Sequence, residues 1–449
     1  MKDTLARIAQ VINNCAQFIK NYSATKNFWR RLGKNIASET QTTIDEYNRA
    51  LDDLMQQYRD RALRDTRINV YRVLEDLNLD GIAYASGAGL NTTKKCLDGT
   101  RMEILKEIVD WIYNPDVNAP RIFWLHGQAG RGKSAIAHTI ALWLKNVGGL
   151  GSCFCFARDR QSERREEKML STIARDLANR DPAFRRGLAK AIEEDNTLKT
   201  TPDVMQQWEK LLLQPLSKIS GGIVGNVVVV IDALDESGLD VSRMHILSVL
   251  TSMEAASLPS NFRILLTSRP LSDIMVALRD AQHVKATSLD NIPSVLTERD
   301  IRLYVSNKLK GLGDIGEREI EYITVKADGL FEWARLACDF IKPGFAGETA
   351  KECFEELIAR ASGEGATLLD GMYSAILESA VGRKPISLVR FRSLMRQILH
   401  TLEPLPMDAL HAIRQYFPHE EDHYNVAIVL NYMGSLLSVT EWGLLFWRL

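Results

Sequence analysis

Long apolar runs, early prolines and an excess of charge are all missing from this 449-residue chain, whose first proline is Pro115. No run approaches the ~18 apolar residues that a membrane helix requires. No apolar segment follows a basic start, so the sequence predicts no secretory leader. A net charge of -1 gives no bulk attraction to nucleic acid. We therefore expect a cytoplasmic protein that binds no nucleic acid.

Cysteine is also scarce, and its spacing fits neither a disulfide framework nor a metal site. Cys153 and Cys155 lie two apart in an apolar run, so they should share one face of a buried strand. We interpret them as small core residues in a reducing compartment. The six cysteines are Cys15, Cys96, Cys153, Cys155, Cys338 and Cys353.

Apolar periodicity divides the chain into five parts. Residues 1–80 repeat apolar side chains at helical spacing and predict a helical hairpin or bundle, while residues 81–100, rich in Gly, Thr and Asn, predict a linker. Residues 101–289 alternate helices with apolar strands, which is typical of a parallel sheet covered on both faces. Residues 290–380 and 381–449 return to helical spacing. The predicted fold class is an α/β domain with helical parts on either side.

Within these parts the sequence predicts individual elements. The strands are 121–126, 151–157, 226–232, 262–268 and 282–288. The main helices are 101–113, 133–146, 165–180, 203–219, 241–254, 297–311, 316–342, 349–360 and 407–417.

Basic residues dominate the first forty positions, with seven Lys/Arg against Asp3 and Glu39. One interpretation is a helix that lies on a membrane surface, anchored by Phe28 and Trp29. The other, which we favour, is a solvated helix face balanced by the acids at 45–60.

A glycine-rich stretch, HGQAGRGKSAIAH at residues 126–138, follows the apolar run 122–125. Its spacing fits the P-loop pattern G-x-x-x-x-G-K-[ST]. We expect the amides from Gly130 to Lys133 to hold a β-phosphate, Lys133 to reach the β and γ oxygens, and Ser134 to bind Mg²⁺. The alternative is a glycine-rich turn with a solvated lysine. The predicted contacts to the nucleotide are Gly127, Gly130, Arg131, Gly132, Lys133, Ser134 and Ala135.

A second segment, VVVVIDALDES, ends an apolar strand with three acids. Asp232 stands where a Walker B carboxylate holds the metal's water shell. Glu236, beside Asp235, is the candidate to activate the attacking water. Alternatively, Asp235 and Glu236 cap the following helix.

A third segment, RILLTSRP, ends another apolar strand with polar residues. If this strand lies between those that carry the P-loop and Asp232, its end faces the γ-phosphate. Arg269 would then sense that phosphate, and Thr267 or Ser268 could position water. Three strand ends converging on one point predict that the chain binds ATP or ADP with Mg²⁺.

Together the segments HGQAGRGKSAIAHTIA, VVVVIDALDES and RILLTSRP resemble the NACHT-type NTPases of the STAND class, the signal transduction ATPases with numerous domains. The chain looks similar to the fungal NOD-like receptors, whose NTPase is similar to the N-terminal domain of nephrocystin. The resemblance covers about residues 81–440 and includes CLDGTRMEILKEIVDWI (96–112). It implies that Arg101 lies near the adenine or ribose.

The same resemblance implies roles for the flanking parts. Residues 290–380 would form a helical lid subdomain and residues 381–449 a winged-helix-like subdomain, while residues 1–80 resemble helical effector or adaptor domains. WD-type repeats usually follow in such proteins, and this sequence carries none. In related receptors a histidine of the winged helix contacts the β-phosphate, and the sequence does not choose among His400, His411, His419 and His423.

We therefore expect a signalling switch of the kind used in innate-immunity-like or cell-death signalling. ADP would hold the lid closed, exchange to ATP would allow self-association through the NTPase domain, and slow hydrolysis would reset the state. Residues 1–80 would then engage a helical signalling partner or a membrane.

Three alternatives compete with the switch. An ordinary catalytic P-loop ATPase or kinase would use lid arginines, for which Arg158, Arg160, Arg164 and Arg165 are candidates, although interleaved acids favour a solvated helix start. A nucleotide-binding scaffold would show no turnover. A DNA-binding regulator is disfavoured because residues 381–449 hold seven Lys/Arg against six Asp/Glu.

Overall fold

A computed structural model of the chain describes residues 2–24, 34–157, 166–219, 225–238, 240–342, 348–360, 370–374, 377, 385–401, 405–418, 422–430, 437–439 and 445–447. The chain separates into two units, Met1–Asp80 and Gly81–Leu449. None of the helices in the described ranges combines the length and apolar character that a membrane crossing requires.

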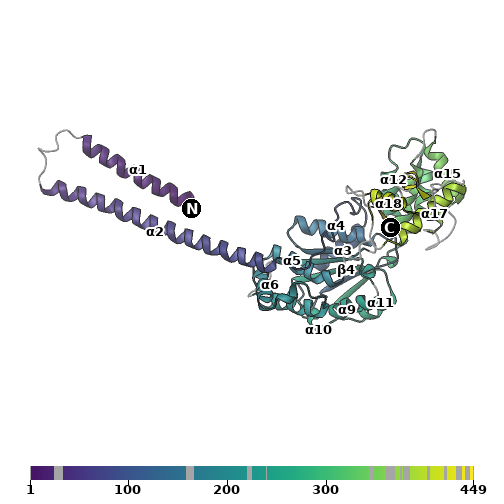
Figure 1. Ribbon diagram of the computed structural model, residues 1–449, viewed down its shortest axis with the longest axis horizontal. Coiled ribbons are helices and arrows are strands. Elements are labelled where there is room, and N and C mark those ends of the chain that lie inside the picture. Colours follow the sequence, from purple (N-terminus) through teal and green to yellow (C-terminus); the bar gives the residue numbers. More distant parts are fainter. Residues whose placement is uncertain are drawn as a thin grey trace. The chain divides into compact units, whose positions relative to one another are not determined.

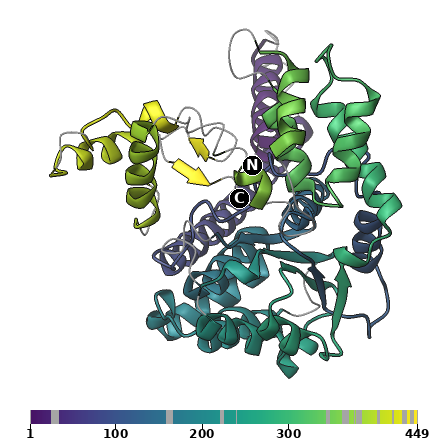
Figure 2. The ribbon, with the colours of Figure 1, turned by 90° about the vertical axis from the view of Figure 1, so that its right-hand side faces the viewer.

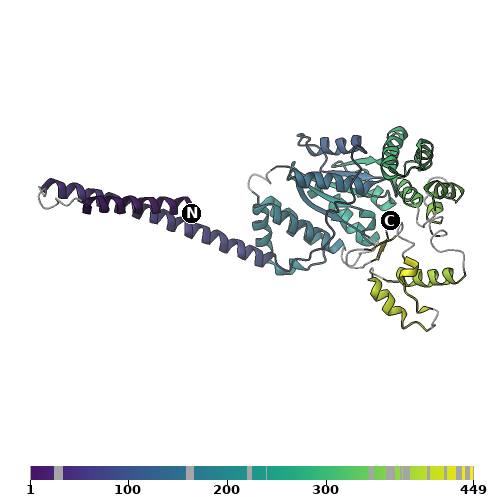
Figure 3. The same cartoon turned by 90° about the horizontal axis from the view of Figure 1, so that it is seen from above.

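The first unit is a pair of long helices, α1 (Lys2–Ala24) and α2 (Lys34–Leu79). They lie side by side in both Figure 1 and Figure 3. Ile8 of α1 and Leu54 of α2 are buried, and the Arg61 guanidinium of α2 donates a 2.7 Å hydrogen bond to the Thr4 hydroxyl of α1. Apolar and polar contacts therefore both join the two helices.

The second unit contains a five-stranded parallel sheet. Its strands are β1 (Ile122–His126), β2 (Leu150–Cys155), β3 (Val227–Asp232), β4 (Phe262–Ser268) and β5 (Val284–Ser288). The order is β2-β3-β4-β1-β5. β4 therefore lies between the strand before the glycine-rich loop and the strand that ends in Asp232, which meets the condition set for Arg269 in the sequence analysis. The predicted α/β fold class is confirmed.

Helices cover the sheet because its strands are apolar on both faces. α3 (Met102–Ile112) and α4 (Lys133–Asn146) share one core with Phe123, Leu125 and their neighbours on that face. Figure 1 places α9 (Asp240–Leu250) and α11 (Ser272–Leu278) on the other side of the sheet from α4. The other described helices here are α5 (Met169–Arg180), α6 (Pro182–Glu194), α7 (Val204–Gln207), α8 (Gln214–Ser217) and α10 (Met253–Ala256), with a π-helical turn, Trp208–Leu213, between α7 and α8.

Residues 81–100, predicted to be a linker, carry no helix or strand but pack closely on the α/β domain. The Ala85 amide donates to the Thr172 hydroxyl at 3.0 Å, and the Cys155 amide at the edge of the sheet donates to the Ala88 carbonyl at 2.7 Å. The Cys96 amide donates to the Thr139 hydroxyl of α4 at 2.9 Å. We call this segment the strap.

A helical subdomain follows, with α12 (Ser294–Lys308), α13 (Glu317–Lys326), α14 (Phe331–Ile341) and α15 (Ala350–Arg360) packed beside one another, mostly in green in Figure 2. The prediction of one helix over 316–342 is wrong. The chain turns at Asp328 and Gly329, whose φ angles are 46° and 76°. Two successive left-handed residues cannot continue a right-handed helix, so α13 and α14 form separately.

The last part contains α17 (Pro385–Leu399), α18 (Met407–Arg414) and α19 (Ala427–Leu430), followed by the antiparallel strands β6 (Leu437–Val439) and β7 (Leu445–Trp447). The assignment of residues 381–449 to a winged-helix-like subdomain stays a prediction. Leu394, Leu410 and Val426 join the same core cluster as the helical subdomain.

Candidate functional site

The loop between β1 and α4 is shaped for an anion. Gly130 and Gly132 have φ angles of 78° and 90°, a region that L side chains rarely adopt. A Cβ on Gly132 would meet no atom within 4 Å in the described ranges, so backbone conformation rather than crowding requires glycine there. The first amides of α4, from Lys133 onward, have no acceptor within the helix and carry the positive end of its dipole. Loop and helix together form an anion-binding cradle.

Lys133 lies inside this cradle. Its Nζ donates to the carbonyls of Gly127 at 2.7 Å and Gln128 at 2.9 Å. Burial lowers the pKa of Lys133, while Asp235 opposes that shift from a distance. Within the described part of the chain, no carboxylate forms an ion pair with Nζ. The ammonium is therefore held by neutral carbonyls and is available to a phosphate group.

Asp232 ends β3 with its side chain fixed by the neighbouring strand. Its Oδ1 accepts a 2.5 Å hydrogen bond from the Thr267 hydroxyl, which in turn accepts the Ala233 amide at 3.0 Å. The Ser268 hydroxyl accepts the Trp124 indole N–H at 2.8 Å on the opposite face of the sheet. Both hydroxyls are therefore engaged within the protein, and Thr267 positions Asp232 rather than standing free to position water.

Arg269 joins the two acids that follow β3. Its backbone amide and its Nε contact the Asp235 carboxylate at 3.0 and 3.1 Å. One terminal nitrogen lies 3.9 Å from Glu236 Oε1. The side chain of Asp235 is 3% exposed and that of Glu236 is 25% exposed. Because Asp235 is buried against Arg269, Glu236 is the acid with better access to water.

Arg101 connects three elements at the cradle. Its amide donates to Asp300 of α12 at 2.8 Å, and its guanidinium donates to the Arg131 carbonyl at 2.8 Å. The guanidinium also stacks on the Phe331 ring of α14, 4.6 Å from its centroid. Arg101 is 4% exposed, and its buried Nε has no hydrogen-bond partner among the described residues. The structure thus places Arg101 against the glycine-rich loop.

The helical subdomain touches the same loop directly. The Glu332 amide, in the first turn of α14, donates to the Gly130 carbonyl at 3.1 Å. The Arg131 Nε lies 3.2 Å from Asp290 Oδ1, just before α12. A Cβ on Gly329 would lie only 2.0 Å from an Arg131 guanidinium nitrogen, so the two residues are in close contact. We call these contacts the loop clamp.

Comparison with known families agrees with this geometry. Residues 99–269 match the family model described as nephrocystin 3, N-terminal, which spans the loop, Asp232 and Arg269. The chain contains a P-loop NTPase domain. A Walker-type ATPase of Pyrococcus abyssi is similar in structure, with 14% identity, 77% of this chain and 92% of that chain covered, and a TM-score of 0.37. No curated protein gives a significant match.

The NTPase domain fits a nucleoside phosphate and Mg²⁺. The cradle amides and Lys133 supply donors for phosphate oxygens, and the Ser134 hydroxyl and Asp232 carboxylate are hard oxygen ligands of the kind that Mg²⁺ prefers. A bound Mg²⁺ would neutralise charge between phosphate oxygens. The roles of Glu236 and Arg269 in hydrolysis, and of Arg101 near the base or sugar, remain predictions.

Sequence reasoning missed the partners of the loop, Asp290 and Glu332, and the partner of Arg101, Asp300. The sequence gives only a weak signal for these contacts, since Asp300 is simply an acid on a predicted helix. The structure shows that this acid is buried, with 2% of its surface exposed. Nothing in the spacing of the motifs indicates that it meets Arg101, because the contact joins residues 199 positions apart.

The histidine candidates fall into two groups. His400 and His423 each pair with a nearby backbone carbonyl, at 2.7 and 2.8 Å. The Nδ1 of His411 is buried and has no hydrogen-bond partner in the part of the chain that the structure describes. His419 and the arginines at 158, 160, 164 and 165 lie outside the described residues.

Thr267→Val is expected to weaken Mg²⁺-dependent hydrolysis by about 10- to 100-fold, the effect typical of losing an outer-shell partner of a metal ligand. Binding of ADP without Mg²⁺ should stay unchanged, because Thr267 contacts Asp232 and not the cradle. ATP turnover and ADP titration measure the two effects. Ser268→Ala, on the opposite face, is the control and should lose little. Equal losses in both variants would contradict the assignment.

Proposed function

We propose that the chain is an ATP/ADP-binding signalling switch of the NACHT/STAND class. The observation that supports it is the loop clamp. The helical subdomain binds the P-loop through Gly130 and Arg131, next to the amides that would hold the phosphates. Any change in the loop that accompanies exchange of nucleotide therefore acts directly on the subdomain.

In this proposal ADP favours the state in which the clamp is made. Exchange to ATP releases the helical subdomain and the C-terminal part, and the NTPase domains then self-associate and gather the N-terminal helices. Those helices would engage a helical signalling partner or a membrane. A differential affinity of about 5.5 kcal/mol is enough to shift such an equilibrium from 1:99 to 99:1.

Slow hydrolysis would return the switch to the ADP state. Glu236 would orient and deprotonate the attacking water, and Arg269 would respond to the γ-phosphate, since both side chains lie beyond the ends of β3 and β4. Ser134 and Asp232 would hold Mg²⁺. Cytoplasmic signalling in an innate-immunity-like or cell-death pathway is the biological role that we infer from the resemblance to NOD-like receptors.

The decisive experiment combines nucleotide content with molecular size. The purified chain is denatured and its released nucleotide identified, and native samples with ADP or a non-hydrolysable ATP analogue are compared by light scattering. We expect stoichiometric ADP and a larger particle with the analogue only. A chain that turns over ATP rapidly and stays one size with both nucleotides would favour an ordinary ATPase and overturn the switch.

A further inference from the structure

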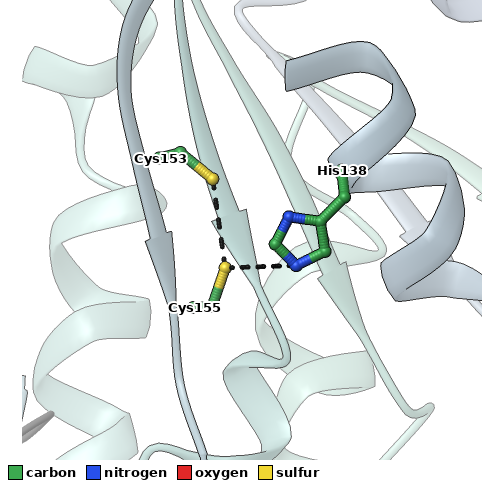
Figure 4. A group of neighbouring side chains, drawn as sticks. All are labelled: His138, Cys153 and Cys155. Atoms are coloured by element: carbon green, nitrogen blue, oxygen red, sulfur yellow. Dashed lines mark hydrogen bonds between the residues drawn. The ribbon is translucent and has the colours of Figure 1, made fainter. Parts of the chain in front are cut away.

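Three side chains that can bind soft metal ions meet beneath α4, outside the nucleotide cradle. Figure 4 shows His138 from α4 facing Cys153 and Cys155 from β2. The two sulfur atoms are 3.9 Å apart, and the Cys155 sulfur lies 3.7 Å from His138 Nε2. All three ligand atoms lie within 4.8 Å of one another.

The local structure explains why these residues converge. Side chains two apart on a strand point to the same face of a sheet, so Cys153 and Cys155 both face α4, in the core that also contains Ile136 and Ala137. His138 is one turn beyond Ser134 on α4. All three cluster residues are buried, with exposures of 2 to 6%.

The strap orients the imidazole. The Asn91 amide donates to His138 Nδ1 at 3.2 Å, which directs Nε2 toward the sulfur atoms. Nε2 also lies 3.8 Å from Asp232 Oδ2, the carboxylate oxygen that Thr267 does not contact. The fourth side of the cluster therefore faces the Walker B aspartate.

We propose that His138, Cys153 and Cys155 form a binding site for a thiophilic divalent cation of the Zn²⁺ type. In tetrahedral coordination, bond lengths of about 2.3 Å to sulfur and about 2.0 Å to nitrogen separate two sulfurs by about 3.8 Å and sulfur from nitrogen by about 3.6 Å. The observed 3.9 and 3.7 Å lie close to these values. Three protein ligands leave one coordination position toward Asp232.

Charge balance also suits a buried site. Two thiolates and a neutral imidazole together offset the charge of a divalent cation, so the complex has no net charge to desolvate. Binding releases both thiol protons to solvent and moves the imidazole proton from Nε2 to Nδ1, because Nδ1 accepts the Asn91 amide in the metal-free site. The Asn91 amide then loses its acceptor, a cost that the metal–ligand bonds must exceed.

Cobalt tests the site in the full-length chain, because thiolate-bound Co²⁺ absorbs strongly in the near ultraviolet and tetrahedral Co²⁺ absorbs in the visible. The chain is stripped with a chelator, kept reduced with a phosphine and titrated with Co²⁺. We expect one equivalent to give both bands and one equivalent of Zn²⁺ to displace them. Cys155→Ser and His138→Gln should each weaken Co²⁺ binding by at least about tenfold.

Two controls distinguish this site from the remaining thiols and from the nucleotide cradle. Cys338→Ser removes another buried thiol, in the helical subdomain, and should leave the bands unchanged. Lys133→Ala should also leave them unchanged, so failure of nucleotide binding and failure of the metal site are distinguishable. A folded wild-type chain without a thiolate band, or a band that survives in folded Cys155→Ser, would overturn the proposal.

Discussion

Lys133→Ala is expected to purify without bound nucleotide and to bind ADP at least about 100-fold more weakly than the wild type. The Lys133 ammonium is half-buried in the cradle, and its acceptors among the described residues are the carbonyls of Gly127 and Gln128. Each hydrogen bond from a charged group to phosphate contributes about 1.5 to 3 kcal/mol, and 1.4 kcal/mol is about tenfold in affinity. Isothermal titration and the nucleotide released on denaturation measure the loss.

Lys145→Ala is the matched control, since Lys145 lies in the last turn of the same helix. It removes a lysine of α4 far from the cradle and should keep its nucleotide. If both variants bind ADP as tightly as the wild type while folded, the cradle does not bind phosphate and the glycine-rich loop has another role.

Gly329→Ala is expected to break the loop clamp and release ADP about tenfold faster. A Cβ at this position would lie 2.0 Å from an Arg131 guanidinium nitrogen, and the flexible arginine must leave. Its ion pair with Asp290 is then lost as well. A loss of about 1 to 2 kcal/mol corresponds to roughly tenfold. Stopped-flow release of a fluorescent ADP analogue measures the rate, and assembly should occur at a lower concentration of the ATP analogue.

Gly311→Ala is the control that distinguishes loss of the loop clamp from the backbone strain of the substitution. Gly311 also has a positive φ, 98°, but a Cβ there would meet no atom of the described residues within 4 Å. Both substitutions therefore carry a left-handed alanine, which costs about 1 to 2 kcal/mol, and only one displaces Arg131. If the two variants release ADP at the same rate, the clamp does not control the nucleotide.

The sequence predicted most accurately the helices and strands, because these depend on residues that are close together in the chain. α4 spans Lys133–Asn146, as its periodicity predicts, and β4 spans Phe262–Ser268, as its apolar run predicts. The position of β4 in the sheet was only a condition of the sequence argument, because strand order depends on contacts between segments far apart in the chain, and the structure supplies it. The break between α13 and α14 was missed, since Asp328 and Gly329 interrupt a helical pattern that continues on both sides.

The residues of the candidate site likewise include some that the sequence identifies and some that it does not. Lys133 and Asp232 are recognisable because a short motif carries their chemistry. The loop clamp is not recognisable from the sequence, because it joins Gly130 and Arg131 to residues beyond 289. The sequence around those residues predicts helices and does not indicate a contact with the loop. Cys153 and Cys155 were interpreted as core residues for a similar reason: the third member of their cluster, His138, comes from a different element.

The strap has a practical consequence for how the NTPase domain can be isolated. Among the described strands β2 is at the end of the sheet, next to β3, and on its other side the Cys155 amide pairs with the Ala88 carbonyl of the strap. A strand edge without such cover offers free backbone groups to other chains. A fragment that starts at residue 99, where the family match begins, would lack most of the strap and expose the β2 edge of the sheet. Copies could then pair edge to edge, and that aggregation would mimic the nucleotide-driven assembly that the switch proposal predicts.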